Sequence, residues 1–208
     1  MKDILSILDG KWEDGTRPKD LYNLYISKKP TEYLETIVEG LNSSKRKVQS
    51  GCAELASLLS EDTPEILYPH LELFISNLDA KAPVLRWKAV CIIGNLAPVD
   101  KKKAIPSLVD KISFFLDDKS IVLQGHSVRA LTKISKAFPE TAPTAFKRLT
   151  ASANRFPGNR VGFIVEAMEA FADYPELVEE ARDFVESYAD SDIKSVARKA
   201  NRTLKKLG

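Results

Sequence analysis

The sequence predicts an all-α fold built from repeated helical hairpins. Prolines recur along its 208 residues at a nearly constant interval. Between them, apolar residues recur at spacings of three and four, which is the pattern of one helical face. No segment alternates apolar and polar residues as a half-buried strand does. With 44% hydrophobic residues, the chain also has enough apolar side chain to bury a core.

The prolines mark the junctions between the repeated units. Pro69, Pro106 and Pro143 lie 37 residues apart, and each stands a few residues before an apolar helical pattern. Proline suits the first turn of a helix because the N–H that it lacks would have no partner there. We therefore expect a helix to begin close to each of these prolines.

Each unit contains two helical patterns, and those of the first two units match at an offset of 37. In the first helix, the matching positions are Leu34, Ile37, Val38 and Leu41 with Leu71, Phe74, Ile75 and Leu78. In the second helix they are Val48, Cys52, Leu55 and Leu59 with Leu85, Ala89, Ile92 and Leu96. A structural unit that returns at a fixed period is the signature of a repeat protein.

Residues 1–32 do not share the repeat and are expected to form an N-terminal helical cap. We expect a short helix around Ile4 to Leu8 and a second helix from about Pro18 to Ser27. The loop at 9–15 is acidic, but it lacks the alternating ladder and the terminal glutamate of an EF-hand. We interpret this loop as a turn and not as a calcium site.

The remaining residues, 33–208, divide into five hairpins in one continuous domain. Their approximate limits are 33–66, 67–104, 105–141, 142–175 and 176–208. The turns inside the hairpins are rich in Asp, Ser, Asn, Gly and Pro, which end one helix and cap the next. Because no hairpin can bury its apolar face alone, we expect the hairpins to stack into an α-solenoid, or α-α superhelix.

The second helix at 85–96, with the sequence LRWKAVCIIGNL, is similar to a known consensus. Together with the proline-led first helices and the Asp at the hairpin turn, it makes the chain resemble the HEAT-repeat and armadillo-like superfamily. The resemblance covers about five sixths of the chain. It implies that the second helices line an inner, concave surface. The family's frequent arginine early in this helix has its match at Arg86, whereas Gln124 occupies the position in the third hairpin.

The residues that carry chemistry are few and scattered. The two histidines, His70 and His126, have no cysteine or histidine at a metal-ligand spacing. Cys52 and Cys91 lie on or beside the apolar faces of second helices, so we interpret them as buried structural thiols and not as nucleophiles. No glycine-rich phosphate loop occurs. We therefore expect no catalytic residue, no cofactor and no metal site.

The charge distribution indicates a two-sided molecule. The net charge is only +2, but the predicted second helices are net basic and the first helices net acidic. A basic inner face could hold nucleic-acid backbone or an acidic peptide. The positions equivalent to Arg129 are Glu54, Cys91, Glu166 and Lys199, whereas a phosphate track needs cations in successive units. This column therefore favours a peptide over a nucleic acid.

A neighbouring column of the second helices suggests a binding anchor. It consists of Ser50, Trp87, Gly125, Gly162 and Ser195, all predicted opposite the core. A tryptophan on a floor of small residues, flanked by Arg86 and Lys88, has the composition of an interface hot spot. The alternative is that the small residues allow close packing and that Trp87 fills a gap between repeats. Arg129 and Lys133 on the third hairpin could extend the surface.

These observations predict a non-enzymatic scaffold that binds a protein or peptide on the inner surface of its second helices. The expected partner-binding residues are Arg86, Trp87, Lys88, Arg129 and Lys133. The alternative is a nucleic-acid-binding solenoid with a role in DNA repair. The start of the chain shows no signal peptide and no apolar run reaches membrane-spanning length, so we expect a cytoplasmic protein. The polar end repeats predict a monomer.

Overall fold

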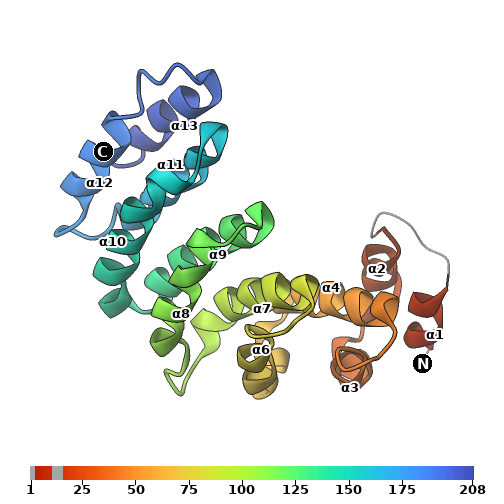
Figure 1. Ribbon diagram of the computed structural model, residues 1–208. Coiled ribbons are helices and arrows are strands. Elements are labelled where there is room, and N and C mark those ends of the chain that lie inside the picture. The colour runs from red at the N-terminus through yellow and green to blue at the C-terminus, as the bar shows by residue number, and fades with distance from the viewer. Residues whose placement is uncertain (1–2, 11–15) are drawn as a thin grey trace. The chain divides into compact units, whose positions relative to one another are not determined.

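The computed structural model describes residues 3–10 and 16–208, which form helices and turns without a strand (Figure 1). The all-α fold of about five helical hairpins with a helical cap is confirmed. The chain forms two compact units, Met1–Lys101 and Lys102–Gly208. The single continuous domain stays a prediction. Residues 11–15 of the loop interpreted as a turn lie outside the described residues.

The first unit contains the cap and two hairpins. The cap consists of α1 (Ile4–Asp9), α2 (Thr16–Leu21) and a π-helical turn, η1 (Tyr22–Ile26). The first hairpin pairs α3 (Pro30–Gly40) with α4 (Arg46–Asp62). In the second hairpin, α5 (Pro64–Leu67), η2 (Tyr68–His70) and α6 (Leu71–Asn77) pair with α7 (Pro83–Leu96) and η3 (Ala97–Val99).

Packing in the first unit centres on the two second helices. α4 and α7 pack against each other, and α3 and α6 each pack against the second helix of their own hairpin. Leu55, Leu59 and Ile92 are almost completely buried in this core. The buried Asn95 amide donates a hydrogen bond of 2.8 Å to the Ser60 hydroxyl, so α4 and α7 also share a buried polar contact.

Two glycines allow helices of the first unit to approach closely. A Cβ atom at Gly51 would lie 2.5 Å from Cδ2 of Leu8, so α1 can rest on α4 only because this position has no side chain. A Cβ atom at Gly40 would collide with Sγ of Cys52, where α3 meets α4. Both glycines therefore serve packing.

The second unit contains three hairpins. The first consists of η4 (Ile105–Leu108), α8 (Val109–Phe114) and η5 (Phe115–Asp117), followed by α9 (Ile121–Ala137). The next consists of η6 (Pro139–Thr141), α10 (Ala142–Ser152) and η7 (Ala153–Arg155), followed by η8 (Gly158–Val161), α11 (Gly162–Ala167) and η9 (Met168–Phe171). The last pairs α12 (Val178–Glu186) with α13 (Lys194–Leu204).

The second helices of this unit, α9, α11 and α13, lie side by side in that order (Figure 1). The turn before α9 caps the start of this helix, as its composition predicts. The Ser120 hydroxyl accepts a hydrogen bond of 3.3 Å from the Leu123 backbone N–H, and the Asp118 carboxylate accepts one of 2.7 Å from the Ser120 N–H. These contacts satisfy N–H groups that the first turn of a helix leaves without partners.

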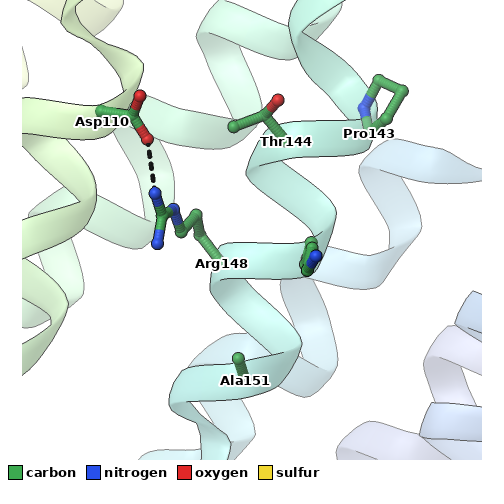
Figure 2. A pocket seen from close by; sticks show the side chains of 6 residues that line it. Asp110, Pro143, Thr144, Arg148 and Ala151 are labelled. Carbon is green, nitrogen blue, oxygen red and sulfur yellow. Dashed lines mark hydrogen bonds and ion pairs between the residues drawn. The ribbon is translucent and has the colours of Figure 1, made fainter.

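Ion pairs join the first helices of successive hairpins in this unit. Arg148 on α10 lies 2.8 Å from the Asp110 carboxylate on α8. Figure 2 shows these two side chains pointing toward each other. Arg155 on η7 pairs with Asp117 on η5 in the same way. All four side chains are about half exposed, so each pair contributes little to stability by itself. Their main effect is on how the two helices align.

The packing around Gly40 and Gly125 predicts that replacing each by alanine changes the free energy of unfolding in opposite directions. Gly40→Ala should lower the free energy of unfolding by about 1 to 3 kcal/mol, because the added methyl group overpacks the contact with Cys52. Gly125→Ala should raise it by about 0.5 to 1 kcal/mol, because Gly125 lies inside α9 and its Cβ atom would meet only Phe163, at 3.9 Å. Urea unfolding followed by circular dichroism measures both changes. Equal effects of the two variants would contradict the described packing.

Candidate functional site

The predicted cation Lys88 is buried and paired. Only 7% of the residue is exposed, and its Nζ lies 2.5 Å from Oε2 of Glu54 on α4. The same ammonium group lies 4.4 Å from the centre of the Trp87 ring. Lys88 therefore neutralises a carboxylate of the neighbouring hairpin and holds a cation–π contact with a partly buried tryptophan. Its charge is directed into the unit.

Arg86 is partly buried, and its Nε is enclosed without a hydrogen-bond partner within the described residues. Its equivalents in the neighbouring hairpins show what this position does. Gln49 Nε2 donates to the Leu41 carbonyl oxygen and Gln124 Nε2 to the Leu116 carbonyl oxygen, each at 3.1 Å. These contacts tie the start of the second helix to the end of the first. The position of Arg86 thus faces the inside of the hairpin.

Arg129 and Lys133 lie on α9 in the second unit, and both are exposed. They therefore belong to a different unit from Arg86, Trp87 and Lys88. Within the described residues, no carboxylate pairs with the Arg129 guanidinium group. Arg129 is also the predicted site residue that lines a pocket on the second helices.

This pocket, hereafter the second-helix pocket, has a volume of about 350 Å³ and lies across α9, α11 and α13. Its lining residues are Gly125, Val128, Arg129, Thr132, Phe163, Glu166, Ala167 and Lys199. The volume lies within the range of small-ligand sites and could accept one or two side chains of a partner. It combines an aromatic wall with one cation that has no internal partner.

Small residues shape the floor of the second-helix pocket. The Phe163 ring reaches toward α9 and would lie 3.9 Å from a Cβ atom at Gly125. Gly162 leaves room for the Lys199 stem, whose Cδ would lie only 2.8 Å from a Cβ atom. Lys199 therefore bends back over α11, and its Nζ lies 5.2 Å from the centre of the Phe163 ring. Of the predicted column of small residues, Gly125 lines the pocket and Gly162 lies under Lys199, and Phe163 is the aromatic residue beside them.

The acidic residue of the pocket is already neutralised. Oε2 of Glu166 lies 2.6 Å from Nζ of Lys199, and Oε1 contacts Arg202. Lys206 pairs with Glu169 at 2.5 Å in the next turn. Three cations of the basic C-terminal segment thus join it to the preceding hairpin. The unpaired charge that remains in the pocket is that of Arg129.

Phe163 and Glu166 are pocket residues that the sequence prediction did not include. Phe163 occupies the register position of Lys88 and His126 and follows Gly162 directly. An aromatic residue next to the small column was therefore a usable signal. Glu166 was recognised only as an interruption of the basic column, whereas it is the partner of Lys199 and Arg202.

A second pocket lies on the first helices of the same unit and has a volume of about 480 Å³ (Figure 2). It is lined by Asp110, Pro143, Thr144, Lys147, Arg148 and Ala151. Asp110 and Arg148 face each other across it and form the ion pair already described. Asp110 and Arg148 are engaged with each other, and Lys147 is an exposed cation of this pocket.

The described residues contain no cluster of His, Cys, Asp and Glu that could hold a metal ion. Cys52 is fully buried in α4, and this burial raises the pKa of its thiol to about 12. Burial and the neighbouring Asp62 carboxylate, 2.5 Å away, likewise raise the pKa of the Tyr22 phenol. Both groups are therefore neutral near pH 7.

The structure is similar to solved engineered repeat proteins. It matches one engineered protein of the Northeast Structural Genomics Consortium with a TM-score of 0.67 and 18% identity, over 99% of this chain and 89% of that chain. It matches computationally designed armadillo repeat proteins for modular peptide recognition with a TM-score of 0.65 and 16% identity, over 99% and 90% of the chains. The sequence matches no family model and no curated protein. The chain thus has an armadillo-like and HEAT-like helical-repeat fold.

No helix in the described part of the chain combines the length and the apolar character needed to cross a membrane.

The burial of Lys88 predicts unequal effects on stability for its ion pair. Glu54→Ala should lower the free energy of unfolding by about 2 kcal/mol, because it leaves a buried ammonium group without its counter-charge. Lys88→Met should cost less, because it removes the charge and keeps most of the side-chain volume. Urea unfolding of both variants makes the comparison. If Glu54→Ala were neutral, Lys88 would not depend on this pair.

The buried thiol predicts a difference in labelling. At pH 8, Ellman's reagent should modify the partly exposed Cys91 and leave Cys52 unmodified until denaturant is added. The thiolate is the reactive form, and the raised pKa keeps Cys52 protonated at the labelling pH. The free energy of unfolding is accordingly unaffected by the ionisation of this thiol below about pH 9 and falls above it, because the unfolded chain can then ionise the thiol more readily than the folded chain. A Cys91→Ser variant isolates the Cys52 signal, and rapid labelling of that variant in the folded state would refute its burial.

Proposed function

We propose that this protein is a helical-repeat scaffold that binds a peptide segment of a partner protein on its second helices. The second-helix pocket is the observation that carries the proposal. It presents the Phe163 ring, the floor at Gly125 and the unpaired Arg129 side by side on one face of the second unit. An aromatic residue next to an arginine is the composition typical of interface hot spots.

The fold supports this choice. Designed armadillo repeat proteins of similar structure serve modular peptide recognition, although they share only 16% identity with this chain. Repeat proteins in general bind partners on extended surfaces made by equivalent helices of successive units. In this chain, α9, α11 and α13 each contribute residues to the same pocket. A peptide that runs across these helices would contact three consecutive hairpins.

The charges of the pocket favour a peptide over a nucleic acid. A phosphate backbone needs several cations in succession, and its affinity depends on how many phosphates are neutralised. Here Lys199 and Arg202 are both paired with Glu166, and Lys206 is paired with Glu169. One unpaired arginine suits a single anionic group better than a charged strand. The scaffold is proposed as non-enzymatic because the pocket combines no nucleophile with a general base.

A block of the pocket tests the proposal. Peptides selected from a phage library of random dodecapeptides on the full chain should bind Gly125→Leu at least about tenfold more weakly, because the leucine side chain would occupy the pocket floor. Fluorescence anisotropy with the labelled peptides measures the change. Lys136→Leu adds the same side chain to an exposed position of α9 outside the pocket and should leave binding unchanged. Equal binding to Gly125→Leu and the wild type would reject the pocket as the binding site.

A further inference from the structure

Arg129 is the group that gives the second-helix pocket its chemical preference. The residue is exposed at the pocket rim, and its side chain makes no hydrogen bond within the described residues; apart from the backbone bonds of α9, its carbonyl oxygen accepts from the Thr132 hydroxyl at 2.8 Å. The guanidinium group therefore keeps all its donors available. A guanidinium group binds carboxylates with two parallel hydrogen bonds, which favours this anion by charge and by shape.

The rest of the pocket does not compete for this arginine. Glu166 is the carboxylate that lines the pocket, and both of its oxygens are engaged by Lys199 and Arg202. Lys199 is bent back over Gly162 and pairs with Glu166, so its charge is already matched by a carboxylate of the pocket. The pocket thus has one excess positive charge, carried by Arg129.

Part of the pocket lining is apolar. Phe163 is half-buried and reaches toward Gly125, and Val128 and Ala167 also line the pocket. A volume of about 350 Å³ leaves room for an apolar side chain beside the carboxylate that Arg129 would bind. The pocket is therefore complementary to two adjacent side chains of different character.

We propose that the second-helix pocket recognises a peptide in which an aspartate or glutamate stands next to a large apolar residue. The carboxylate pairs with Arg129, and the apolar side chain packs against Phe163. This inference rests on the proposed function and adds the identity of the ligand class to it. In this proposal Arg129 determines the preference for an acidic side chain, and Gly125 leaves the pocket floor open to the ligand.

Charge reversal tests the preference. Random dodecapeptides displayed on phage are selected on the full wild-type chain and, in parallel, on Arg129→Glu. We expect the wild-type selection to enrich Asp or Glu beside Phe, Leu or Ile, and the Arg129→Glu selection to enrich Lys or Arg instead. A synthetic copy of a peptide enriched on the wild-type chain should bind Arg129→Gln at least about tenfold more weakly than it binds the wild type. This loss is expected when a charge-assisted hydrogen bond is removed. Lys136→Glu, on the same helix outside the pocket, should retain the affinity.

A double-mutant cycle shows whether the two charges meet. Replacing the acidic residue of the peptide by its amide should weaken binding to the wild type but should add little to the loss already caused by Arg129→Gln. Because Arg129 is exposed and has no internal ion pair, its variants should unfold at the wild-type urea concentration.

The two proposals fail in different ways. Enriched peptides that lack acidic residues, or that bind Arg129→Glu as well as the wild type, would overturn the inference while sensitivity to Gly125→Leu upheld the proposed function. Selection that enriches no peptide would overturn both proposals. Binding of labelled single-stranded DNA at low salt that is lost with Arg129→Gln would show that the pocket's anionic ligand is a phosphate backbone, which would also overturn the inference.

Discussion

Burial of the apolar stripe on each second helix is the constraint on which both units of this protein depend. No hairpin can cover that stripe by itself, so α4 packs on α7, α9 on α11, and α11 on α13. The close contacts need small or polar residues at defined places, such as Gly51 under Leu8 and Ser60 beside Asn95. The faces that remain after this packing carry the ion pairs and the pocket.

The second-helix pocket follows from the same rule. Gly125 and Gly162 leave space beside their helices, and side chains from the next helix take up part of it. Lys199 uses the space at Gly162 to reach Glu166, whereas the space at Gly125 stays open beside Phe163 and Arg129. The same column of small residues therefore serves side-chain packing at Gly162 and the pocket at Gly125.

The sequence was sufficient for the fold because helical periodicity, proline spacing and capping residues act locally. Ser120 caps α9 as its turn composition predicts. Lys88 could not be placed in this way, because its burial depends on Glu54 in the preceding hairpin and not on its own helix. Arg129 was found because exposure follows from register, but the pocket needed Phe163 from another helix. An interpretation of the sequence that takes one helix at a time does not predict the contacts between hairpins.

The two ion pairs between the first helices of the second unit have an equal separation in the chain. Asp110 and Arg148 are 38 residues apart, and so are Asp117 and Arg155. One residue inserted between the helices that carry them would shift both pairs at once, and neither could re-form without the other. Single-residue insertions and deletions should therefore be tolerated less well at this junction than the exposure of its loops suggests. Because both pairs span the same number of residues, a change in the length of this repeat would disturb the two pairs together.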